Sequence, residues 1–243
     1  MIFRNKKANL AEGLAKYEKE PPGYKKRTRT VSETASRYVY DKEENCYRNT
    51  EVRSENTARL MCVGDLMCEE KMYKAYNFDD KFLPYGIFYY VKKVFAEADF
   101  VIGNLETTIC EEAPYTGEEY KINGKYHCNA PASYLDILKY AGFDMFALSN
   151  NHNLDCGALG IGETIEEVEK RKFLHTGLYT DPNEKDRYVV VNINGIKVAF
   201  LSYSTWFNRN LNRLTEKGQG LLNIYDIEKV KENITAAKGP GEA

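Results

Sequence analysis

Each of three short apolar runs in this chain stops at polar residues suited to metal binding or acid–base chemistry. The runs are 59–64 before Asp65, 99–103 before Asn104 and Glu106, and 143–149 before the polar loop 150–157. In an α/β protein, loops at the carboxyl ends of neighbouring strands converge on one crevice, where ligands bind. The sequence therefore predicts an α/β fold in which these loops share one edge of a sheet.

Beyond residue 58 the pattern alternates between strands and helices. Apolar residues at helical spacing predict helices over 84–98, 132–141, 157–173 and 226–237. The nearly continuous apolar run 143–149 is typical of a strand covered on both faces. Two β-rich runs around Asn194 and Gly195 predict a hairpin over 188–203. We assign residues 58–243 to one domain.

Residues 1–57 differ in composition from the rest of the chain, being rich in Lys, Glu, Arg and Thr, with Pro21 and Pro22. We expect a polar extension that is flexible or docked at the periphery, with a short helix over 8–20. The basic stretch 25–29 is interleaved with acids nearby and is best interpreted as solvated. The net charge of −2 gives no electrostatic reason to expect nucleic acid as a partner.

The sequence shows no targeting signal. No apolar run is long enough for a transmembrane segment, and the first residues lack the apolar core of a secretory signal, which predicts a cytoplasmic location. The six cysteines are widely spaced and form no Cys-x-x-Cys pair. We expect reduced thiols, with Cys62 as a small core residue of the strand 59–64.

The first two loops supply the predicted carboxylates. Gly64 permits a tight turn and leaves room for Asp65 to approach a cation, although a turn or helix cap is the alternative. In an extended segment Asn104 and Glu106 lie on the same side, with Leu105 opposite. Glu106 would then be a charged ligand and Asn104 a neutral oxygen donor or clamp that also contacts substrate. The alternative for Glu106 is a surface carboxylate.

The third loop is the most specific feature. The amide oxygen of Asn151 suits a hard or borderline metal, and Asn150 is a candidate substrate contact. His152 is a candidate metal ligand or general acid, since imidazole titrates near neutral pH. Asp155 either orients His152 or caps the following helix.

Two residues elsewhere are weaker candidates. His127, in the long loop 107–130, either contacts substrate or metal or is structural. Trp206, beside Asn208 and Arg209, forms a pocket wall, or packs in the core or against a partner.

These loops resemble the CapA family, the poly-γ-glutamate capsule biosynthesis proteins related to calcineurin-like metallophosphatases. The matching motifs are Gly64-Asp65-Leu66-Met67, Asn104-Leu105-Glu106, Ala141-Gly142-Phe143-Asp144, Ser149-Asn150-Asn151-His152 and Asp155-Cys156-Gly157. The resemblance covers residue 59 to the end. It implies a metallophosphatase-like sandwich of mixed β-sheets flanked by helices.

The resemblance also implies roles for these residues. Asp65, Glu106 and Asn151 would bind divalent metal ions (manganese, iron or zinc), and His152 would stabilise or protonate a leaving oxygen. Two departures stand out: Asp65-Leu66-Met67 lacks the Asp-x-His of related phosphatases, and the chain stops at Ala243, before a His-Trp-Gly-type segment of the family. We therefore expect part of the fold and of the site to be missing at the C-terminus.

Three functions are compatible with this resemblance. The first is a role in poly-γ-glutamate or related envelope polymer metabolism, with a metal-dependent phosphoesterase-like site acting on an anionic polymer or a phosphorylated small molecule. The second is a non-catalytic protein that keeps the hydrolase shell and binds polymer or a capsule synthase. The third is a soluble phosphodiesterase or nucleotidase. By the same resemblance, membrane association competes with a cytoplasmic location.

Overall fold

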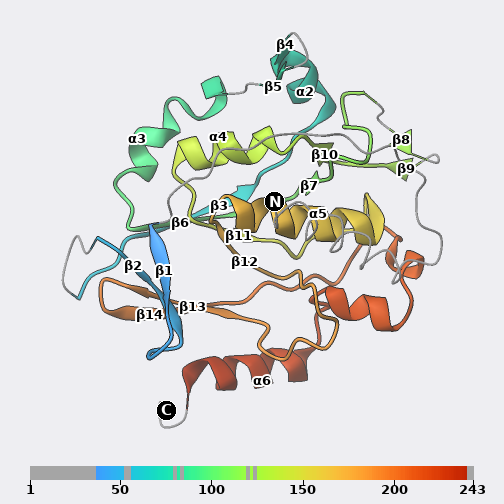
Figure 1. The fold of residues 1–243 in the computed structure, drawn as a ribbon. Coiled ribbons are helices and arrows are strands. Elements are labelled where there is room, and N and C mark those ends of the chain that lie inside the picture. The colour runs from blue at the N-terminus through green and yellow to red at the C-terminus, as the bar shows by residue number, and fades with distance from the viewer. Residues whose placement is uncertain are drawn as a thin grey trace, which may run out of the picture.

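The three apolar runs form adjacent strands of one parallel sheet (Figure 1). The computed structural model describes residues 37–51, 56–78, 81–82, 85–118, 121–122 and 125–239. The strand order is β12-β11-β6-β3, with β3 at Leu60–Asp65, β6 at Phe100–Asn104, β11 at Met145–Ala147 and β12 at Leu174–Thr176. Every pair in this sheet is parallel, so the loops after β3, β6 and β11 leave from the same end.

A second sheet is mixed and contains the predicted hairpin. Its order is β1-β2-β13-β14, with β1 at Tyr38–Asp41, β2 at Cys46–Asn49, β13 at Val189–Ile193 and β14 at Ile196–Phe200. β2 pairs in parallel with β13, and the other pairs are antiparallel. Asn194 and Gly195 have φ angles of 53° and 91°, and this left-handed geometry is what a two-residue type I′ turn needs.

The two sheets pack face to face, with helices outside (Figure 1). On β6 and β11 the side chains alternate, so that Phe100 and Met145 contact the second sheet while Val101 and Phe146 contact the helices. The Phe100 ring stacks on Phe200 at 5.0 Å between centroids. This two-sided cover confirms the interpretation of 143–149 as a buried strand, and the architecture is that of a metallophosphatase-like sandwich.

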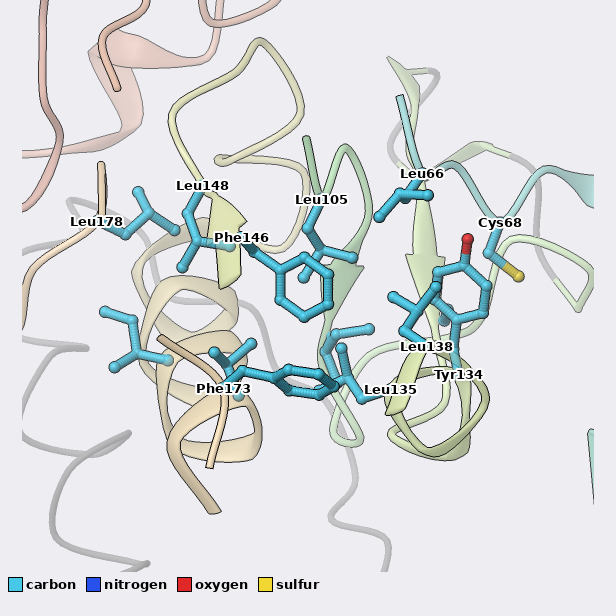
Figure 2. Packing of buried hydrophobic residues seen from close by; sticks show 14 of the residues in the cluster. Leu66, Cys68, Leu105, Tyr134, Leu135, Leu138, Phe146, Leu148, Phe173 and Leu178 are labelled. Carbon is cyan, nitrogen blue, oxygen red and sulfur yellow. The ribbon is translucent and has the colours of Figure 1, made fainter. Parts of the chain in front are cut away.

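Helices α4 and α5 cover the outer face of the parallel sheet. They span Ser133–Ala141 and Gly157–Lys170. Figure 2 shows Leu135 and Leu138 of α4 beside Phe146 and Leu105, in the largest core cluster. Gly142 ends α4 with a φ of 105°, as predicted. On the far side, α6 (Ile227–Lys238) lies below the second sheet, and Asp226 caps its first turn.

The predicted helix 84–98 is split into two pieces. A 3₁₀ turn, η1, spans Tyr85–Phe88, and α3 spans Val91–Phe95. The expected apolar face is only partly used, because Val94 is 50% exposed whereas Phe88 and Phe95 both pack on the Phe143 ring. The remaining short elements are α2 (Glu70–Tyr76), β4 (Asn77–Phe78), β5 (Lys81–Phe82), β7 (Thr108–Ile109), β8 (Lys121–Ile122), β9 (Lys125–Tyr126), β10 (Asn129–Ala130), η2 (Leu211–Arg213) and η3 (Lys217–Leu221).

Part of the predicted extension belongs to the second sheet. Residues 38–49 form the β1–β2 hairpin, and the Arg37 guanidinium anchors it by donating to Asp144 at 2.8 Å from Nε to Oδ1. Burial raises the pKa of Asp144, and Arg37 opposes that rise. Residues 1–36, with the expected helix 8–20 and the basic stretch 25–29, lie outside the described residues. For that part, the division at residue 57 stays a prediction.

All six cysteines are free thiols. The expectation for Cys62 is wrong, because its side chain is exposed rather than buried. β3 is the edge strand of the described sheet, so one side of it has no neighbouring strand. None of the described helices has the length and apolar character needed to traverse a bilayer.

Candidate functional site

One amide joins the carboxylates of the first two loops. Asn104 Nδ2 donates to Asp65 Oδ1 at 2.8 Å and to Glu106 Oε2 at 3.0 Å. The pairing of β3 with β6 shifts between Val63 and Asp65, and this irregularity places Asp65 opposite Asn104. A Cβ added at Gly64 would meet no atom within 4 Å, so the room at Asp65 does not depend on the glycine. Asn104 thus bridges the two carboxylates, and its predicted role at a cation, as an oxygen donor or a clamp, stays a prediction.

The carboxylate of Glu106 has a pKa raised above its ordinary value. Its side chain is largely buried, with the residue 9% exposed. Burial raises the pKa of Glu106, and the adjacent Asp65 raises it further, while His152 and Asn104 act in the opposite direction. Two carboxylates that share a neutral amide repel each other, and a proton or a cation between them relieves that repulsion.

The imidazole of His152 is held between two acids. Its Nδ1 lies 2.7 Å from Asp155 Oδ2, and its Nε2 lies 3.8 Å from Glu106 Oε1. Burial lowers the pKa of His152, but the hydrogen bond and charge of Asp155 outweigh burial, so the pKa is raised overall. Asp155 Oδ2 also accepts from Cys128 N at 2.6 Å. Asp155 thus makes the contact that an orienting role needs, and the N-cap residue of α5, Cys156, makes no side-chain capping bond. The catalytic part of that role stays a prediction.

Asn150 ties the third loop to the second. Its Nδ2 donates to Leu105 O at 2.9 Å and to Asn104 Oδ1 at 3.2 Å, and its Oδ1 accepts from His152 N at 3.0 Å. With 7% exposure, Asn150 is placed to position its neighbours. Substrate contact by Asn150 or Asn104 stays a prediction.

Asn151 turns toward another segment. Its Nδ2 donates to Asn208 Oδ1 at 3.2 Å, and the Trp206 indole N–H donates to the same oxygen at 3.2 Å. Trp206 is 53% exposed, so it does not pack in the core. The predicted role of Asn151 as a metal ligand is not tested by these contacts.

His127 lies apart from this cluster of contacts. Its residue is 4% exposed, and its Nε2 lies 3.1 Å from Pro114 O. Contact with substrate stays a prediction for this side chain.

Two residues that hold the third loop were not singled out from the sequence. Thr108 Oγ1 donates to His152 O at 3.0 Å, and Arg213 Nη1 donates to Leu154 O at 3.0 Å. Thr108 lies two positions after Glu106, so its closeness to a candidate loop was a usable signal. Arg213 is far along the chain and carries no motif that points to it.

The side chains at the site fit a cation that is bound by two carboxylates rather than by a full set of protein ligands. Within the described ranges, no three His, Cys, Asp or Glu side chains converge in an arrangement that holds a metal ion. Asp65 and Glu106 nevertheless provide two carboxylates that are bridged by one amide and raise each other's electrostatic cost, with His152 as the only nearby group among the described residues that can be positive. A Mg²⁺-like ion is commonly held by one or two carboxylates, with waters and substrate phosphate oxygens completing its shell.

Comparison with known proteins places the chain in a family. The family described as bacterial capsule synthesis protein PGA_cap matches residues 59–243. The chain belongs to this family. The capsule biosynthesis protein CapA of Bacillus anthracis is 27% identical over 191 residues, which are 77% of this chain and 44% of that protein. The PGA biosynthesis protein CapA of Bacillus subtilis is 26% identical over 155 residues, 62% of this chain and 38% of that protein.

The matched region 59–243 covers all three site loops, and therefore contains Asp65, Glu106 and His152. The chain spans less than half the length of these two curated relatives, 44% and 38%. The family is therefore established, while the activity of the whole protein is a matter for proposal.

Proposed function

We propose that this chain acts in capsule or cell-envelope polymer biosynthesis through a phosphoesterase-like site that uses a divalent metal ion. One observation carries the proposal: Asp65, Glu106 and His152 come from the ends of different loops and meet within hydrogen-bonded contact of Asn104 and Asp155. Carboxylates and an oriented imidazole at the carboxyl ends of parallel strands form a reaction centre suited to phosphoryl chemistry.

In this proposal Asp65 and Glu106 hold the cation. When bound, such an ion stabilises negative charge on a phosphoryl group and lowers the pKa of a bound water. Oxygen ligands favour manganese among the expected metals, since zinc and iron sites use more imidazole or thiolate. Asn151 would add a further ligand through its Oδ1, because its contact with Asn208 uses Nδ2.

His152 would supply the proton. Asp155 holds Nδ1, which leaves Nε2 on the side of Glu106. The raised pKa keeps a larger fraction of the imidazole protonated at neutral pH, as a donor to a leaving oxygen requires. The substrate would be an anionic polymer or a phosphorylated small molecule. The name of the relative, capsule biosynthesis protein CapA, suggests a capsule synthase as the partner.

A second candidate is a non-catalytic member that binds polymer or a synthase partner. It is favoured by the absence of a three-ligand metal cluster among the described residues and by the lack of a histidine at positions 65–67. A soluble phosphodiesterase or nucleotidase is the third candidate, and a screen of phosphorylated metabolites separates it from the first.

The deciding experiment measures cation binding and hydrolysis on the same samples. We expect Mn²⁺ to bind by calorimetry and an aryl phosphate to be hydrolysed, with binding weakened at least about tenfold in Glu106→Gln. Glu228→Gln, which removes an exposed carboxylate of α6, is the matched control and leaves both unchanged. Mn²⁺ binding that is the same in Glu106→Gln would rule out the metal site, and binding without hydrolysis would favour the non-catalytic candidate.

A further inference from the structure

The segment after β14 reaches back to the third site loop. Ser204 pairs with the chain near Ile224, and its Oγ donates to Trp206 O at 2.8 Å. Phe207 is 3% exposed and anchors the segment in the main core. The conformation around Trp206 is therefore fixed on both sides.

Asn208 connects the indole to the site. Its Oδ1 accepts from Trp206 Nε1 and from Asn151 Nδ2, each at 3.2 Å. Asn151 directly precedes His152 in the chain, so one shared acceptor links the indole to the loop that carries the imidazole. With 53% of Trp206 exposed, a large part of an aromatic side chain is open to solvent beside this loop.

The backbone next to Trp206 is unusual. Asn208 and Arg209 both have left-handed φ angles, 48° and 61°. Two consecutive non-glycine residues in this region are uncommon, and such conformations persist where the surroundings hold them, often at ligand sites. Asn210 N donates to Phe207 O at 2.8 Å and closes the turn.

Arg209 is an exposed cationic residue that directly follows Asn208 in this turn. Its guanidinium makes no ion pair with any residue that the structure describes. A guanidinium suits phosphate oxygens, so Arg209 is a candidate contact for the anionic group of a ligand that stacks on Trp206.

We propose that Trp206 and Arg209 form a platform that selects a phosphoester with a ring next to its phosphate group. The inference rests on the function proposed above and narrows its substrate class. A sugar ring or a nucleobase would stack on the indole while Arg209 pairs with the anionic group. A linear anionic polymer lacks the ring that this surface is suited to hold.

The sequence offers a direct probe, because Trp206 is the single tryptophan among 243 residues. We would titrate the Mn²⁺-supplied chain with glucose 1-phosphate, uridine monophosphate and glycerol 3-phosphate and follow the tryptophan emission. The two ring-bearing esters should change the emission saturably and bind about tenfold more tightly than glycerol 3-phosphate. Tighter binding of uridine monophosphate identifies a base as the stacked group, and tighter binding of glucose 1-phosphate identifies a sugar. Equal dissociation constants for all three esters overturn the platform.

Variants then separate the ring from the charge, with calorimetry as the readout. Trp206→Leu should weaken the ring-bearing esters about tenfold and glycerol 3-phosphate less than about twofold. Arg209→Gln should weaken all three esters alike. Tyr90→Leu removes an aromatic that is 82% exposed between η1 and α3, and should change nothing. A Trp206→Leu variant that binds every ester like wild type overturns the proposal.

Measuring the binding of inorganic phosphate distinguishes failure of the Trp206–Arg209 platform from failure of the proposed phosphoesterase-like function. If the Mn²⁺-supplied chain binds no inorganic phosphate, the phosphoesterase-like function falls and the platform with it. If inorganic phosphate binds but ring-bearing esters gain nothing, only the platform is overturned.

Discussion

Two clusters of charged side chains in this molecule balance their carboxylates in different ways. Near α4 and α5, the Arg171 side chain is fully buried, and its guanidinium donates to Asp136 Oδ1 and Glu167 Oε2, each at 2.6 Å. At the candidate site, Glu106 and Asp65 share the neutral amide of Asn104, and the nearest group that can be positive is the His152 imidazole, 3.8 Å from Glu106 Oε1. The first cluster contains a permanent cation for its carboxylates, whereas the second has, among the described residues, only a titratable imidazole.

The difference indicates what each cluster is for. Buried charges that are paired and hydrogen-bonded serve the fold, and removing one partner leaves an uncompensated charge. Carboxylates held together without a permanent cation destabilise the fold, and such groups cluster at functional sites. The structural cluster should therefore control stability, and the site cluster should respond to added ions.

The largest expected effect on stability comes from removing the guanidinium of Arg171. Arg171→Met leaves the 3% exposed Glu167 without its guanidinium and should lower the free energy of unfolding by about 3–5 kcal/mol. Denaturant titration measures this. Arg59→Met, which removes an exposed ion pair to Glu97, should cost less than about 1 kcal/mol. Similar losses in both variants would contradict the view of the Arg171 cluster as structural.

Adding a cation to the site should have the next largest effect. Mn²⁺ at about one hundred times its dissociation constant should stabilise the fold by about 2.7 kcal/mol, because it binds the native state alone. A thermal melt with and without Mn²⁺ measures this shift. The shift should vanish in Asp65→Asn and persist in Glu228→Gln; an equal shift in Asp65→Asn would place the ion elsewhere.

The Asp155–His152 contact should set the pKa of His152, the proposed general acid. Asp155→Asn keeps an acceptor for Cys128 N but removes the negative charge, so the pKa of His152 should fall and activity should drop about 10- to 100-fold. The chain has three histidines, so an NMR pH titration can follow His152. Because its folded pKa is raised, its stabilising contribution is present below the ordinary imidazole pKa and is lost as pH rises through the raised value. An unchanged His152 titration would exclude Asp155 as its perturber.

The smallest effect concerns Glu163, a half-buried carboxylate of α5. Burial, with a contribution from Glu112, raises the pKa of Glu163 to about 7. Its folded pKa lies above the unfolded one, so its contribution to stability is present in acid and is lost as pH rises toward 7. Glu163→Gln should thus stabilise the fold by about 2 kcal/mol at pH 8 and little at pH 4, by denaturant titration. A gain of equal size at both pH values would argue against titration of this side chain.

Local pattern was enough for much of the fold and for the meeting of the site residues. The runs that became β3, β6 and β11 were visible as apolar segments, and their polar ends met because parallel neighbours share a carboxyl edge. The Asn194-Gly195 turn and the Gly142 cap were set by residues that tolerate left-handed backbone.

The features that the pattern missed depend on distant contacts. The polar segment 38–49 becomes part of a sheet through pairing with β13, which lies far along the chain. Val91 and Val94 matched a helical face that the core does not use. Asn208 and Arg213 touch the third loop across many residues, and no local spacing marks them.

The register shift between β3 and β6 has a consequence for how such a site changes over time. Successive side chains of a strand point to opposite faces, so one extra residue reverses the direction of everything after it. Here the extra residue is Gly64, and its position before Asp65 puts Asp65 opposite Asn104. Loss or gain of a single codon just upstream would aim the acid away from Asn104 and leave the strand itself in place.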